Sequence, residues 1–205
     1  MPSLLSFLQD TMHWHEARRM VNKVKIVKKE IAYRGPYVSV ENHHFISKKG
    51  NNLVWQVVKR ANSKKIVIVF ALTKKKEVLL TKMFRIPQKS FVIEYPAGLT
   101  DRKGEAYPAA ARRELLEETG YRAGRLIKII EGPFNAGMSV DRAVVFFAPD
   151  VMYARKPLLD EAEEIDVIKV PIGKFVDFVM HPPKGCLVDI KMLGVVPILK
   201  KRKLI

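Results

Sequence analysis

The sequence has only one cysteine, Cys186, among its 205 residues. A single cysteine excludes an internal disulfide framework and fits a protein of the reducing cytosol. Long apolar runs are missing as well: the run LLSFL near the start is far shorter than the roughly 20 residues of a membrane-spanning helix, and no small-residue cleavage site follows it. We therefore expect a cytoplasmic protein that is not embedded in a membrane.

Acidic residues are also few, since the chain has 21 aspartates and glutamates against 37 lysines and arginines, which gives a net charge of +16. The lysines stand in small clusters, such as KKK at 74–76 and KKRK at 200–203. Such a surface attracts polyanions, including nucleic acid and phosphorylated small molecules. Net charge indicates solubility and non-specific binding more than a dedicated site, so we expect nucleic acid only as a non-specific partner.

The rest of the composition is ordinary for a globular protein, with 48% hydrophobic and 28% charged residues. The length suits one large domain, or a compact domain with a smaller appendage. Segments rich in β-branched and aromatic residues predict a small β appendage over residues 1–60, with a role in dimerisation. The strand-like segments are 24–33, 37–42 and 54–60, and residues 1–20 suit a short amphipathic helix.

Residues 61–205 are predicted to form the main domain, of the α+β class, because strands and helices do not alternate regularly. A continuous apolar run over 64–72 predicts a strand buried on both faces, and KKK predicts a hairpin tip before a strand over 77–85. Further strands are predicted at 125–132, 143–149 and 165–170. Helices are predicted from Pro108 to a left-handed Gly120, over 172–180, and over 186–193 with an end or kink at Pro197.

The helix that ends at Gly120 carries Glu114, Glu117 and Glu118, which share one face because they stand three and four residues apart. Close carboxylates repel one another, and Arg113 can offset only part of that charge. Hard oxygen ligands without cysteine or histidine suit Mg²⁺ or Mn²⁺, which would hold phosphate oxygens and activate water. For the carboxylates alone, the alternative is a solvated face of glutamates and arginines.

The residues around these glutamates form a longer pattern. Glu105, seven further residues, and then Arg113-Glu114-Leu115-Leu116-Glu117-Glu118-Thr119-Gly120-Tyr121 resemble the Nudix box of the Nudix hydrolase family. One departure is visible, because six residues instead of five separate Gly98 from Glu105. The resemblance implies an α/β/α Nudix sandwich that hydrolyses a nucleoside diphosphate linked to another group. It also implies that Glu114, Glu117 and Glu118 bind metal, and that Arg113 and Glu118 belong to the catalytic group.

The segment before the box, FRIPQKSFVIEYPAG at 84–98, resembles the ADP-ribose pyrophosphatase subfamily. The resemblance implies that Arg85 and Glu94 contact the substrate and that the carbonyl of Ala97 helps to bind metal. An arginine beside a diphosphate makes charge-assisted, forked contacts. The alternatives are a solvated cation at the end of a strand for Arg85 and a buried salt-bridge partner for Glu94.

Aromatic residues in the N-terminal part extend the resemblance. The segment VWQVVKR resembles a strand that stacks a tryptophan on adenine, with an arginine five residues later, and Trp55 and Arg60 keep that spacing. Tyr37 matches a second aromatic position. Two aromatic faces can sandwich any purine, and the alternative is packing in a core or a dimer interface. By the same resemblance the N-terminal strands would pair in a homodimer, with the base site shared between subunits.

Two later segments complete the expected site. FNAGMSVDR at 134–142 resembles a loop that contacts the terminal sugar, and Gly137 and Ser139 match it. DEAEEIDVIKVP at 160–171 resembles a catalytic loop in which Glu161 and Glu163 supply the general base and a metal ligand or its helper. A solvated acidic turn is the alternative for those two glutamates.

The sequence therefore predicts a Mg²⁺-dependent (or Mn²⁺-dependent) hydrolase of nucleoside diphosphate sugars, with ADP-ribose split to AMP and ribose 5-phosphate as the first choice. The nearest alternative keeps the enzyme and changes the substrate, for instance to GDP-mannose. A more distant alternative is a non-catalytic, basic RNA-binding or nucleotide-sensing protein on the same fold. The complete set of carboxylates argues against it, because a binder has no need of all three.

Overall fold

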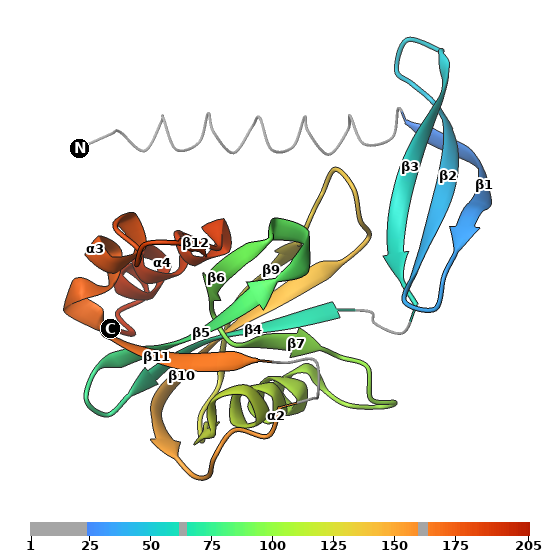
Figure 1. The fold of residues 1–205 in the computed structure, drawn as a ribbon. Coiled ribbons are helices and arrows are strands. Elements are labelled where there is room, and N and C mark those ends of the chain that lie inside the picture. The colour runs from blue at the N-terminus through green and yellow to red at the C-terminus, as the bar shows by residue number, and fades with distance from the viewer. Residues whose placement is uncertain (1–23, 62–64, 160–163) are drawn as a thin grey trace, which may run out of the picture. The chain divides into compact units, whose positions relative to one another are not determined.

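The structure is a computed structural model that describes residues 24–61, 65–159 and 164–205 (Figure 1). The helix predicted within residues 1–20 lies outside the described residues. The described chain divides into two compact units, one of residues 24–61 with Ala136–Val140 and one of the remaining residues. The first unit ends at Ala61 and also includes the loop Ala136–Val140, whereas the sequence predicted a division between residues 60 and 61.

The first unit is a three-stranded antiparallel sheet of β1 (Lys25–Arg34), β2 (Val38–Ile46) and β3 (Asn52–Arg60), in the order β1-β2-β3. Gly50, with a φ of 84°, supplies the left-handed residue of the turn between β2 and β3. The loop Ala136–Val140 lies along β3, because the Val58 amide donates to the Met138 carbonyl at 2.8 Å. The strands predicted in this region are therefore present.

The second unit contains a nine-stranded mixed sheet. Its path runs β12-β6-β5-β4-β10-β8, with β11 beside β5, β7 beside β4 and β9 beside β10. The pairs β4–β10 and β6–β12 are parallel and the others are antiparallel. The strands are β4 (Lys65–Thr73), β5 (Glu77–Arg85), β6 (Ser90–Glu94), β7 (Ala97–Leu99), β8 (Tyr121–Arg122), β9 (Ile127–Pro133), β10 (Arg142–Tyr153), β11 (Ile165–Pro171) and β12 (Cys186–Val188).

Helices cover both faces of this sheet (Figure 1). Successive strand residues point to opposite faces, and β4 is apolar on both. Ile68 and Phe70 pack with α3 (Phe175–Met180) and α4 (Val195–Lys201), whereas Val67 and Val69 pack with α2 (Tyr107–Thr119). The predicted α/β/α sandwich, and the strand buried on both faces at its centre, are confirmed.

Helix α2 follows the predicted rules at both ends. Pro108 lies in its first turn, where a missing N–H leaves no helical bond unmade. Gly120 ends it in the left-handed region at a φ of 76°, and a Cβ there would lie 2.0 Å from the Arg155 carbonyl oxygen. Glycine is therefore required twice, for its backbone conformation and for the close approach of the chain at Arg155.

The C-terminal prediction was partly wrong. The segment 172–180 is helical as predicted, with η3 (Ile172–Lys174) leading into α3, but 186–193 is not a helix. Its first three residues form β12, because they pair with the open edge of β6, and only η4 (Ile190–Met192) is a turn of 3₁₀-helix. Pro197 does not end a helix and lies in the first turn of α4. None of the described helices has the length and apolar character to cross a membrane.

Candidate active site

Arg113 is the centre of the polar network on α2. Its guanidinium makes five hydrogen bonds: Nε to Glu105 Oε1 at 2.9 Å, Nη2 to Glu105 Oε2 at 2.9 Å, Nη1 to Glu114 at 2.7 Å, Nη1 to Glu117 at 3.0 Å, and Nη2 to the Leu99 carbonyl at 3.2 Å. An arginine has five N–H donors in a fixed fork, so all of them are used. Arg113 therefore binds three carboxylates at once, those of Glu105, Glu114 and Glu117.

The pKa values of Glu105 and Glu114, two carboxylates bound by Arg113, are shifted in opposite directions. Hydrogen bonds from Arg113 hold the pKa of Glu105 below its usual value. Burial raises the pKa of Glu114, although the charge of Arg113 acts the other way. Glu114 is therefore a largely enclosed carboxylate whose negative charge is disfavoured by loss of water and only partly offset by Arg113.

Gly98 makes room for Glu114. A Cβ on Gly98 would lie 1.9 Å from the Glu114 carboxyl carbon, closer than any two such atoms approach. Gly98 belongs to β7, which pairs with β4 through Val67. The glycine at the start of the box thus has a steric role: it lets the strand pass directly over the Glu114 carboxylate.

Glu118 lies on the buried side of the same helix, with 8% of its surface exposed. One of its carboxylate oxygens accepts a hydrogen bond from the Ala97 amide at 3.1 Å. Ala97 and Glu118, both predicted to bind metal, are therefore adjacent, and they come from segments 21 residues apart in sequence.

Glu117 is held by two arginines. Arg113 binds its Oε2, and Arg102 Nη2 binds its Oε1 at 3.2 Å. As the side chains stand, the described residues contain no group of three histidine, cysteine, aspartate or glutamate side chains close enough to hold a metal ion. The donor chemistry of Glu114, Glu117, Glu118 and the Ala97 carbonyl nevertheless fits a hard divalent cation, since all are oxygen ligands. Binding would require these side chains to converge.

Arg85 and Glu94 form a close ion pair, with Arg85 Nε 2.6 Å from Glu94 Oε1. They end β5 and β6, which pair antiparallel. The Glu94 side chain is 15% exposed and the Arg85 side chain 43% exposed, so the carboxylate anchors a guanidinium that still reaches solvent. Arg85 is thus a cation at the end of a strand, and Glu94 is its salt-bridge partner, as the two alternatives stated. Neither arrangement excludes contact with a substrate.

The residues predicted to bind the base and the sugar belong to the first unit. Trp55 is 54% exposed and its Nε1 donates to the Gly137 carbonyl at 2.9 Å, while Ser139 bridges to Val58. Arg60 ends β3 opposite Val38, at the same end of the sheet as Tyr37, which is 83% exposed.

Tyr37 and Trp55 are not neighbours. Trp55 pairs with His43, and Tyr37 lies six residues before His43 (43 minus 37). At about 3.3 Å per residue, the two positions are about 20 Å apart along the sheet. Within one chain they cannot sandwich a single base.

Glu161 and Glu163 lie outside the described residues. The chain before them is attached to the end of α2, because the Leu158 amide donates to the Glu117 carbonyl at 2.8 Å and the Ala154 amide to the Gly120 carbonyl at 2.9 Å. The described chain thus meets the box helix two residues before Asp160, the first residue of the acidic segment.

Sequence reasoning missed Arg102 as a partner of Glu117. The available signal was the extra residue in the loop between Gly98 and Glu105, which contains this arginine. Glu105, which follows this loop, binds Arg113 through both carboxylate oxygens.

The chain is similar in sequence and in fold to known proteins. A sequence model described as the NUDIX domain matches residues 63–188. The ADP-ribose pyrophosphatase of Bacillus subtilis (strain 168) is 31% identical over 149 residues, covering 72% of this chain and 78% of that protein. A GDP-mannose pyrophosphatase of Salmonella choleraesuis (strain SC-B67) is 32% identical over 51% of this chain and 58% of its own. A crystal structure described as an ADP compounds hydrolase superposes with a TM-score of 0.74 at 19% identity, covering 88% of this chain and 94% of that one.

Proposed function

Because this chain belongs to the Nudix hydrolase family, we propose that it hydrolyses the diphosphate of a nucleoside diphosphate sugar, and that ADP-ribose is split to AMP and ribose 5-phosphate. The observation that carries the proposal is the placing of two carboxylates of the box helix: Arg113 binds Glu114, which lies beneath Gly98, and Glu118 accepts a hydrogen bond from the Ala97 amide. The similarity to a pyrophosphatase named for ADP-ribose supports the choice of substrate.

Nudix hydrolases generally use divalent metal ions, and we propose Mg²⁺, with Mn²⁺ as a substitute. Glu114, Glu117, Glu118 and the Ala97 carbonyl would hold it. When bound, such an ion neutralises the diphosphate and lowers the pKa of a water molecule. The raised pKa of Glu114 supports this assignment, because a buried carboxylate gains from an added positive charge.

The protein's own side chains would supply the rest of the chemistry. Arg113 keeps the carboxylates oriented, and Arg85, anchored by Glu94, would contact the substrate's diphosphate. Glu161 or Glu163 would take the proton from the attacking water. The attachment of Leu158 to Glu117 supports this last role, because it ties the preceding chain to the helix that carries the metal ligands.

The substrate is tested with a panel of nucleotide sugars and Mg²⁺, followed by chromatography of the products. We expect ADP-ribose to give AMP and ribose 5-phosphate, and chelation of the metal to stop the reaction. A GDP-mannose pyrophosphatase is also among the relatives, so GDP-mannose is the necessary comparison. Turnover of GDP-mannose with none of ADP-ribose would replace our choice of substrate, and no turnover together with tight, salt-sensitive RNA binding would favour the non-catalytic alternative.

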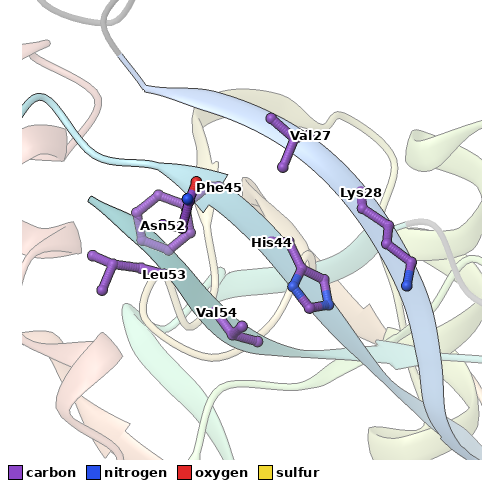
Figure 2. Close-up of a pocket in the computed structure, with 7 residues that line it drawn as sticks. All are labelled: Val27, Lys28, His44, Phe45, Asn52, Leu53 and Val54. Atoms are coloured by element: carbon purple, nitrogen blue, oxygen red, sulfur yellow. The ribbon is translucent and has the colours of Figure 1, made fainter. Parts of the chain in front are cut away.

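We also propose that two copies pair through the N-terminal sheet. Large apolar side chains on β1 and β3 are about half exposed, including Ile26, Ile31, Leu53 and Trp55. Figure 2 shows a pocket that crosses all three strands and is lined by Val27, Lys28, His44, Phe45, Asn52, Leu53 and Val54. Three strands are too few to bury these side chains by themselves.

A second copy would also complete the base site. Tyr37 and Trp55 are about 20 Å apart in one chain at the usual rise of a strand, so two rings on one base require Trp55 from one copy and Tyr37 from the other. Arg60 would lie at the phosphate side, and Gly137 and Ser139 would contact the terminal sugar.

The pairing is tested by sedimentation of the wild type and of Ile31→Glu, which places a charge on the exposed face of β1. We expect a dimer for the wild type and a shift toward monomer for the variant, since a buried, unpaired charge weakens an interface. Lys49→Glu, in the exposed turn between β2 and β3, is the control for added negative charge. A wild-type protein that sediments as a monomer would contradict the proposal.

The cytoplasmic location remains a prediction.

A further inference from the structure

Arg102 differs from Arg113 in how it is held, although both bind Glu117. The Arg102 side chain is 61% exposed and makes one described contact, at 3.2 Å to Glu117 Oε1. The Arg113 side chain is 14% exposed and uses all five donors. Moving the Arg113 side chain would break its hydrogen bonds to three carboxylates. Moving the Arg102 side chain into solvent would break only its hydrogen bond to Glu117.

The loop that carries Arg102 is where this chain departs from the Nudix pattern. It holds six residues between Gly98 and Glu105, and Arg102, Lys103 and Gly104 form its turn. Gly104, directly before Glu105, has a φ of 79°, so a left-handed glycine closes this turn. The longer loop thus carries a cation that contacts Glu117, a glutamate of the box.

We propose that Arg102 is a displaceable cation that occupies Glu117 while the metal site is empty, and that an entering divalent ion must displace it. This inference rests on the proposed metal site. Glu117 Oε2 stays with Arg113, so Oε1, held by Arg102, is the oxygen that is available for a metal. Arg102 therefore weakens the apparent affinity for the ion and raises the metal concentration at which the site fills.

The expected change in metal affinity follows from the solvent exposure of the ion pair between Arg102 and Glu117. An exposed ion pair adds little free energy, so an entering metal ion loses only a little affinity by breaking it. Removing the pair is therefore expected to tighten metal binding by about two- to fivefold. Arg102→Lys keeps the charge in the loop and is expected to lie between Arg102→Ala and the wild type, because a lysine holds a carboxylate less rigidly than an arginine.

The test is a titration of the purified full chain with Mn²⁺, followed by the electron paramagnetic resonance signal of free Mn²⁺. Lys103→Ala is the matched control, since Lys103 is exposed and carries the same charge in the same turn. We expect Arg102→Ala to bind Mn²⁺ more tightly than both the wild type and Lys103→Ala. Equal affinities for Arg102→Ala and Lys103→Ala would overturn the proposal, because the effect would then be one of net charge alone.

Glu118→Gln separates this inference from the proposed function. If Glu118→Gln weakens Mn²⁺ binding but Arg102→Ala behaves as Lys103→Ala does, the metal site stands and the role of Arg102 is wrong. If Mn²⁺ binding does not depend on Glu118, the proposed metal site fails, and this inference fails with it.

Discussion

Replacing Arg113 with alanine is expected to lower the free energy of unfolding by about 3–5 kcal/mol, the range measured when one partner of a buried ion pair is removed. The variant would leave Glu105 and Glu114, whose side chains are 13% and 14% exposed, without the guanidinium that binds both. Domains are stable by only about 5–15 kcal/mol, so the loss is a large share of the total. Urea denaturation followed by circular dichroism measures it.

The matched control is Arg112→Ala, one position earlier on the same helix. Arg112 is exposed and binds only the carbonyls of Pro108 and Gly124 among the described residues, at 3.3 and 3.1 Å. We expect a loss below about 1 kcal/mol for it, as for exposed polar contacts generally. Arg113→Lys is expected to resemble Arg113→Ala more than the wild type, because an ammonium has three donors and no fork. Equal stabilities for Arg112→Ala and Arg113→Ala would show that Arg113 is not the centre of the site.

Glu118→Gln is expected to reduce kcat for nucleotide-sugar hydrolysis by at least about 100-fold while leaving the fold intact. The amide oxygen can still accept the hydrogen bond from the Ala97 amide, so the packing of α2 against β7 is kept. The negative charge is lost, and a metal ligand that contributes several kcal/mol to the transition state corresponds to a factor of this size. The measurement is steady-state release of AMP, together with the thermal midpoint of unfolding.

Asp177→Asn is the matched control for Glu118→Gln. It makes the same change from acid to amide on α3, across the sheet from α2 (Figure 1), and the Asp177 side chain is 84% exposed. We expect its kcat to equal that of the wild type. Unchanged turnover in Glu118→Gln would remove Glu118 from the catalytic group.

The central parts of the fold were predictable because they are encoded locally. The apolar run of β4 identifies a strand buried on both faces, and Pro108 and Gly120 mark the ends of α2. The Nudix box is a local pattern too, because its ligands lie on successive turns of one helix. Such features need only the spacing of neighbouring residues.

What the sequence could not predict depends on distant segments. Cys186–Val188 becomes a strand only because the edge of β6 is open to it, and no local pattern shows that edge. The contact between Arg102 and Glu117 depends on how a turn folds back over the helix. The separation of Tyr37 from Trp55 depends on the register of β2 with β3, which places Trp55 opposite His43.

The most direct test of the proposed active site is a crystal of the full chain grown with Mn²⁺ and a non-hydrolysable analogue of ADP-ribose, in which anomalous scattering locates the metal. We expect manganese within coordinating distance of Glu114, Glu117, Glu118 and the Ala97 carbonyl, beside the analogue's diphosphate, with Arg102 turned away from Glu117. An analogue bound at full occupancy with manganese elsewhere, or with none, would contradict the assignment of these glutamates as the metal site of a hydrolase.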